Sequence, residues 1–327
     1  MVRLSTLLGL LLMFIILCIP RFTMAKEGTT AAQVLEIGPD ARASAMGGAF
    51  TALSDNANSV YYNPAGLARV SGFEIPFTSG DLFGGVRQQF FGCAYSLRDV
   101  RTENVSDLGT IAFGCTLLDL GSLPGRDAVG VPTGQFSADD SAIYLSYGRA
   151  FFNNEYAGMF SAGVTAKFTE EKIESTNTKS QAFDAGILWD NPGRTVSLGA
   201  VLQNMGKTIT YVDESYDLPL YVRVGGALRM LNNDFVVSAE TAQPKDGTTG
   251  FLLGAEYWLV KTIAFRAGYD SRSDLGTGLS AGIGISLRQL DVFFMFAREM
   301  SIDYAFVQGK DTDSVHRISM VMKLGAD

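Results

Sequence analysis

The chain has 327 residues, a net charge of −8 at neutral pH, and one histidine. An acidic balance argues against nucleic acid as a partner, and a single imidazole excludes metal sites built from several histidines. We therefore predict no bound metal.

Residues 1–25 have the composition of a secretory signal peptide. Arg3 precedes an apolar run from Leu7 to Ile19, and the small-residue ending Thr23-Met24-Ala25 follows. Later apolar runs are too short to form a membrane-spanning helix. The sequence thus predicts export, a mature chain that begins at Lys26, and either a large soluble β protein or a membrane β-barrel.

Residues 26–71 form a compact block of small residues. It contains the pair Gly47-Gly48 and closes on Asn63-Pro64-Ala65-Gly66. Glycine and proline interrupt regular structure and permit tight backbone packing. We predict that this block is a plug inside a sheet; the alternative is an ordinary extension packed outside it.

Residues 72–327 alternate between apolar and small or polar residues with a period of two. In the stretch from Phe251 to Trp258, one face carries Phe251, Leu253 and Tyr257, and the other carries Gly254 and Glu256. This period is typical of strands. About fourteen such segments, of roughly ten residues each, match an outer-membrane β-barrel. The fold class predicted is an all-β membrane protein, an antiparallel barrel with an N-terminal luminal plug. The stretch 120–140 is predicted to be a solvated loop.

The second face of the predicted strands is rich in Gly, Ser and Ala and also carries charge. A soluble β-sandwich would place large branched residues inside and charge outside, so this composition favours a narrow, partly polar lumen. An inward-facing glycine such as Gly254 is expected to tolerate serine. The charged residues predicted to line the lumen are Lys167, Arg223, Glu256 and Arg266.

Several motifs carry a resemblance to a known family. The run from Gly38 to Leu53, with Asn63-Pro64-Ala65-Gly66-Leu67-Ala68, resembles the N-terminal signature of the PorV/PorQ family, within the FadL-like superfamily. Leu202-Gln203-Asn204-Met205-Gly206 is similar to the family's "QNxG" turn, and residues 254–269 are similar to its "GAEYW…RAGY" hairpin. The chain ends without the terminal aromatic residue usual in such barrels.

The resemblance implies an outer-membrane location and a function without catalysis. In FadL-like proteins the "NPA" motif lies in a hatch, so Asn63, Pro64 and Ala65 would gate or seal the pore; the alternative is a rigid turn that only anchors the plug. The superfamily implies passive passage of hydrophobic small molecules across the outer membrane, through the lumen of a barrel embedded in outer-membrane lipid and without a cofactor. The closer PorV-type match implies docking of secreted proteins at the cell surface.

An enzymatic function has little support in the sequence. The only histidine, His316, lies three residues from Ser319 on a predicted strand, so the two side chains point to opposite faces. A serine–histidine pair cannot form in that arrangement.

Overall fold

The computed structural model describes residues 30–97, 108–126, 129–173, 176–211, 214–272, 276–288, 297–310 and 312–324. The predicted signal peptide and the first four residues of the predicted plug lie outside these ranges. Within them, no helix combines the length and apolar character needed to cross a bilayer.

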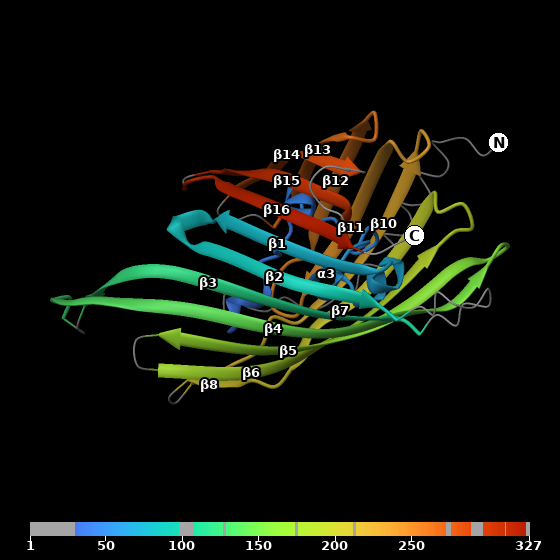
Figure 1. Cartoon of the computed structure of the whole chain (residues 1–327). Coiled ribbons are helices and arrows are strands. Elements are labelled where there is room, and N and C mark those ends of the chain that lie inside the picture. Colours follow the sequence, from blue (N-terminus) through green and yellow to red (C-terminus); the bar gives the residue numbers. More distant parts are fainter. Residues whose placement is uncertain are drawn as a thin grey trace.

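Fourteen antiparallel strands close into a barrel, in which each strand pairs with its neighbour along the chain and β1 closes against β16 (Figure 1). The predicted number of strands and their antiparallel arrangement are confirmed. A separate two-stranded sheet, β8 (Ile209–Tyr211) and β9 (Glu214–Tyr216), lies in the connection between β7 and β10. The barrel strands are β1 (Phe73–Asp81), β2 (Arg87–Ser96), β3 (Thr110–Arg126), β4 (Pro132–Asn154), β5 (Gly158–Ile173), β6 (Thr176–Asp190), β7 (Val196–Gly206), β10 (Tyr221–Met230), β11 (Phe235–Pro244), β12 (Gly250–Leu259), β13 (Ile263–Asp270), β14 (Gly276–Arg288), β15 (Ala297–Gly309) and β16 (Val315–Leu324).

The two ends of the barrel differ. At one end, called the terminal end below, β1 begins at Phe73 opposite Leu324, the last residue of β16. At the other, called the loop end, Asp81 lies opposite His316. The connection that contains β8 and β9 belongs to the loop end, because β7 runs toward it.

The period-two pattern sorts side chains as predicted. On β12, Phe251 and Leu253 face outward with 45% and 49% of their surface exposed, whereas Leu252 and Glu256 are buried. Apolar side chains on other strands, such as Phe91 and Ile283, are exposed in the same way, so the barrel's packed interior lies within the ring of strands.

The prediction of a loop at residues 120–140 is wrong, because β3 and β4 run through most of it. The glycines and prolines that suggested a loop lie where the hairpin extends past its neighbours: pairing with β2 stops at Asp119, and pairing with β5 begins at Ala138. Proline and glycine are tolerated on such unpaired edges. A bulge between Asp119 and Ser122 accommodates Gly121.

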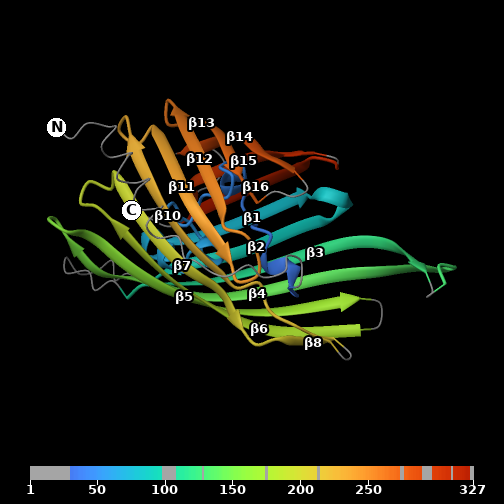
Figure 2. The same cartoon turned by 180° about the vertical axis from the view of Figure 1, so that it is seen from behind.

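The N-terminal segment, defined here as residues 30–72, contains four short helices and is mostly buried. They are η1 (Gln33–Leu35), α2 (Ala41–Ala45), α3 (Ser59–Tyr62) and η2 (Pro64–Arg69). Helix α2 packs against β13–β16, and η2 packs against β3–β6. Figure 2 shows the segment between these two sides of the ring. Its Phe50, Met46 and Leu67 are among the largest fully buried side chains.

A charge on the outward face should destabilise the barrel in lipid. Leu253→Arg is expected to lower the free energy of unfolding by roughly 2–4 kcal/mol, because an arginine at mid-strand would face hydrocarbon. Urea unfolding of protein refolded into phosphatidylcholine vesicles measures this. Gly225→Ser, on an inward face with room for a side chain, is the matched control. Equal stabilities of the two variants would show that the faces are assigned incorrectly.

Candidate functional site

Asn63 joins the N-terminal segment to the barrel wall. Its Oδ1 accepts a hydrogen bond from Ala65 N at 3.1 Å and so caps η2, in which Pro64 occupies the first position, where no N–H is needed. Its Nδ2 donates to Thr51 O at 3.0 Å within the segment and to Ile187 O of β6 at 3.2 Å. One side chain therefore fixes the local turn and attaches it to the wall.

A bulge in β7 turns two consecutive side chains inward. Asp184 of β6 lies opposite both Gln203 and Asn204, and Asn204 adopts a left-handed conformation with φ of 62°. Gln203 Nε2 donates to Tyr61 O at 2.7 Å, directly before the Asn63 turn. The sequence expectation of a turn here is wrong: these residues belong to a strand, and the bulge produces the irregularity.

Gly47 and Gly48 follow α2 and both have positive φ angles, 64° and 73°. Gly47 N donates to Ser280 Oγ of β14 at 3.1 Å. Helix α2 is itself capped by Asp40, whose Oδ1 accepts from Arg42 N at 3.0 Å. The glycine pair thus reverses the chain next to the wall opposite Asn63.

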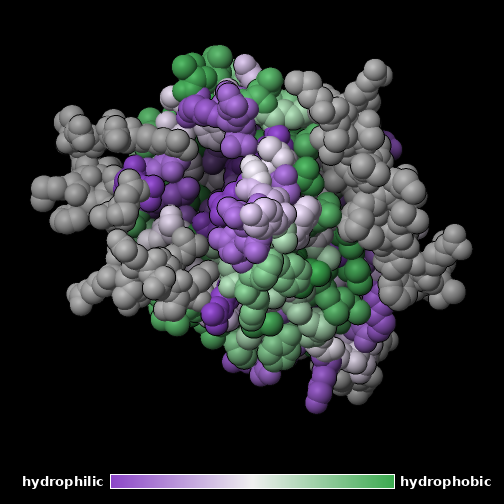
Figure 3. Space-filling view, turned by 90° about the vertical axis from the view of Figure 1, so that its right-hand side faces the viewer, coloured by the Kyte–Doolittle hydropathy of each residue, from purple (hydrophilic) through white to green (hydrophobic). Residues whose placement is uncertain are grey.

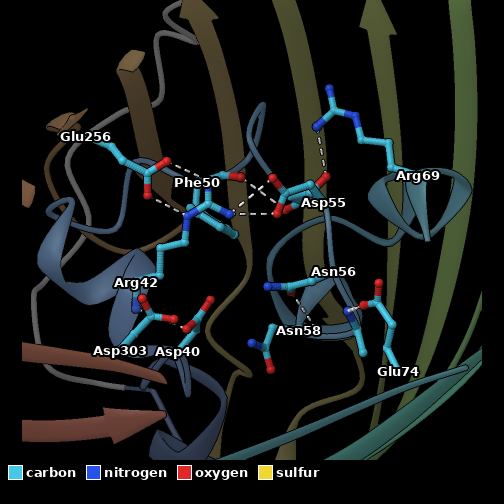
Figure 4. Close-up of polar contacts among 12 residues, drawn as sticks. Asp40, Arg42, Phe50, Asp55, Asn56, Asn58, Arg69, Glu74, Glu256 and Asp303 are labelled. Atoms are coloured by element: carbon cyan, nitrogen blue, oxygen red, sulfur yellow. Dashed lines mark hydrogen bonds and ion pairs between the residues drawn. The ribbon is translucent and has the colours of Figure 1, made fainter. Parts of the chain in front are cut away.

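Arg42 bridges the segment and the wall. Its guanidinium pairs with Glu256 of β12 at 2.8 Å and with Asp55, further along the segment, also at 2.8 Å (Figure 4). Arg266 of β13 pairs with the same Glu256 at 2.6 Å and with Asp303 of β15 at 2.7 Å. Of the predicted lumen-lining residues, Glu256 and Arg266 thus meet in one buried network.

Lys167 and Arg223, the other two predicted lumen-lining residues, belong to separate clusters. Lys167 Nζ lies 2.8 Å from Asp184 Oδ2 and 5.5 Å from the ring centre of Tyr61. Arg223 Nε lies 2.7 Å from Glu240 Oε1, and Glu240 Oε2 accepts from Thr51 N at 2.8 Å. Both clusters contact the N-terminal segment.

The segment is also attached to the wall at the terminal end. Arg69 pairs with Asp190 at 2.5 Å and donates to Ser197 Oγ and to the backbone oxygens of Ala52 and Ser54. Figure 3 views this end, where hydrophilic and hydrophobic residues lie side by side in the centre.

A cavity of about 690 Å³ opens at the loop end; we call it the cup. Its floor is the N-terminal segment, including Leu35, Ile37, Tyr61 and Tyr62, and its walls come from the loop ends of the strands. This volume is within the range of small-molecule sites. The apolar residues of the cup walls are Leu82, Phe83, Val86, Leu220, Val307 and Val315.

Many polar and charged groups line the cup together with these apolar residues. Arg317, which is buried, donates to Gln88 Oε1 at 2.9 Å and to Ser44 Oγ. Although burial alone would lower the pKa of Arg272, its hydrogen bonds to Asp270 raise that pKa above the usual range, so this guanidinium stays charged. The cup is thus a cavity of mixed character, lined by apolar side chains and by charged ones.

His316 and Ser319 face opposite sides of β16, as predicted. His316 is exposed, with Nδ1 2.8 Å from Tyr304 Oη, whereas Ser319 is buried and hydrogen-bonded to Asp40. Among the described residues, no group of three or more His, Cys, Asp or Glu side chains could hold a metal ion.

Comparison with solved structures places the chain among FadL-type outer-membrane channels in fold. The toluene transporter TodX of Pseudomonas putida matches with a TM-score of 0.57 at 13% identity, over 92% of this chain and 98% of TodX. The CymD monoaromatic hydrocarbon channel matches with a TM-score of 0.57 at 12% identity, over 88% of this chain and 98% of CymD. A FadL homologue of Pseudomonas aeruginosa matches with 0.52 at 13% identity, over 92% and 98%.

Sequence comparison is less informative. No protein-family model matches the chain, and no curated protein matches it in sequence. The structural likeness therefore defines the fold, and the narrower PorV/PorQ resemblance stays a prediction.

Removing the Arg42 bridge should loosen the N-terminal segment. Arg42→Gln leaves Asp55 without a salt bridge and Glu256 with Arg266 alone, and breaking a buried pair typically costs about 3–5 kcal/mol. Hydrogen exchange of the amides of residues 41–60 in vesicle-embedded protein should accelerate. Arg87→Gln, which breaks the exposed Arg87–Asp81 pair, is the control and should leave this exchange unchanged. Unchanged exchange in Arg42→Gln would show that the Arg42 bridge does not hold the segment in place.

Proposed function

We propose that this protein is a passive outer-membrane channel for hydrophobic small molecules, closed by residues 26–71. The cup carries the proposal: it is a cavity at the loop end whose wall includes a set of apolar side chains, and its floor is the N-terminal segment. The neighbours in fold include a channel for monoaromatic hydrocarbons and a toluene transporter, which supports the same class of cargo. Transfer of this kind needs no catalytic group and no cofactor.

The arrangement of the barrel supports an outer-membrane location. Fourteen strands is an even number, and barrels of this kind place both chain ends on the periplasmic side and the longer connections outside. The loop end would then face the exterior, and the cup would receive molecules arriving from outside. The outward apolar face would contact membrane lipid.

The closure proposal depends on how the segment is attached. Asn63, Pro64 and Ala65 lie against β4–β6, Gly47 and Gly48 lie against β12–β14, and buried ion pairs join both parts to the wall. Such attachment holds the segment across the path of a molecule leaving the cup. Passage would then require the segment to shift.

Docking of secreted proteins, as in PorV-type barrels, is the second candidate function. The β3–β4 hairpin favours it, because this hairpin extends beyond its neighbours at the loop end and offers an exposed surface with Val129 and Val131 at its tip. Cross-linking in cells that recovers a secreted protein on this hairpin would support docking.

Polar substitution in the cup should reduce uptake of hydrophobic molecules. Leu82→Asp places a charge in the apolar wall, so we expect slower entry of toluene into proteoliposomes. Val129→Asp, at the exposed hairpin tip, is the control and should transport normally. Normal uptake by folded Leu82→Asp protein would exclude the cup as the entry site.

The Asn63 turn is expected to control closure. Pro64→Gly restores backbone freedom at the first residue of η2 without changing an outward-facing contact, so the segment should loosen while the barrel still assembles. Vesicles that carry the variant should leak small hydrophobic probes faster than wild type. Unchanged leakage with normal folding would favour docking, and loss of folding would show that the turn only anchors the segment.

A further inference from the structure

Three inward-facing glycines on adjacent strands pack against the Asn63 turn. They are Gly148 of β4, Gly163 of β5 and Gly186 of β6. A Cβ on Gly163 would lie 2.7 Å from Ala65 N and closer still to the Pro64 carbonyl, and one on Gly186 would overlap Asn63 Oδ1. Separations below 3.0 Å essentially never occur for real Cβ atoms. The turn can occupy this position only because the three strands have no side chains there.

A second group of three glycines lies across the barrel, under residues 45–47. They are Gly254 of β12, Gly268 of β13 and Gly282 of β14. A Cβ on Gly254 would lie 2.7 Å from Met46 O, one on Gly282 would lie 2.5 Å from Ala45 Cβ, and one on Gly268 would overlap Gly47 N. The expectation that Gly254 tolerates serine is therefore wrong, because this position is in contact with the segment.

Both groups are accompanied by polar contacts to the same stretches of the segment. Asn63 Nδ2 donates to Ile187 O next to the first group. At the second, Ser280 Oγ accepts from Gly47 N at 3.1 Å and donates to Ala45 O at 3.2 Å. The segment is therefore hydrogen-bonded to the wall at these two places as well as in close contact with it.

We propose that these two groups of glycines are seats for the segment's backbone, and that they act as positioning residues for the closed channel. This inference rests on the proposed closure and adds to it the part played by residues of the barrel wall. Because the seats lie on opposite sides of the ring, residues 48–62 are held across the lumen from both ends. Closure then depends on the absence of six side chains from the wall as well as on the segment.

The glycines are not explained by the wall's own stability. Glycine in a strand interior is less favourable than alanine, because it loses more conformational freedom and packs no side chain. Gly225 of β10 shows the contrast: it also faces inward, but a Cβ there would meet its nearest atoms, Ala239 O and Glu240 Cβ, at an ordinary 3.4 Å. Alanine at a seat should therefore leave the strand intact and disturb only the segment.

The test is ion conductance of the full-length mature protein in planar bilayers. Gly163→Ala and Gly268→Ala should each raise the conductance several-fold over wild type, whereas Gly225→Ala should match wild type. Gel mobility with and without heating shows that each barrel has folded. Wild-type conductance in both folded seat variants, or an equal rise in Gly225→Ala, would overturn the proposal.

A variant on the segment side keeps the test decisive should a wall variant not fold. Gly47→Ala leaves the wall sequence native, but its Cβ would lie 2.6 Å from Tyr269 N and O, so it should also raise the conductance. Wild-type conductance in this variant would contradict the second seat.

A second pair of variants tests the first seat, and a separate assay tests the transport function. Gly186→Ala and Asn63→Ala should have non-additive effects on conductance, because a Cβ at 186 would meet the Asn63 side chain; additive effects would contradict this contact. Toluene uptake by wild type is measured separately. Raised conductance in the seat variants without wild-type uptake would support the seats and reject hydrophobic transport.

Discussion

The buried ion pairs between wall and segment are the constraint on which the rest of the structure depends. A charge aimed into a barrel needs a partner or water, because leaving it unpaired in a poorly solvated interior is costly. Glu256 forms ion pairs with Arg42 and Arg266, and Asp190 forms one with Arg69. The segment supplies one cation to each side of the ring, so the same contacts that neutralise the inner face also hold the segment across it.

This constraint connects the fold to the cup. The segment is attached to both sides of the ring, and the cup lies on its loop-end side, where Tyr61 and Tyr62 form part of the floor. The residues directly before Asn63 therefore face the cup, and the residues after it lie against β4–β6. A molecule in the cup would touch the part of the chain that continues into the Asn63 turn.

Much of this arrangement could be predicted from the sequence, because period-two alternation depends only on local residue order. That pattern was sufficient to predict the fourteen strands and the outward position of Leu253. It failed for residues 120–140, since glycine and proline signal a loop unless the strand edge is known to be unpaired. It also failed at Gln203 and Asn204, because a bulge places both side chains inward. The role of Gly254 and the partners of Arg42 depend on contacts between distant parts of the chain, which no local pattern contains.

The central claim is that the segment occludes the barrel, and the reactivity of a cysteine at Asn58 tests it most directly. Asn58 is fully buried between the two sides of the wall, and the native Cys93 and Cys115 are unpaired and would be replaced by alanine. In vesicles, Asn58→Cys should resist a water-soluble maleimide added from both sides and react only after unfolding, whereas Val129→Cys should react at once. Equal rates for the two cysteines in the folded protein would contradict the account.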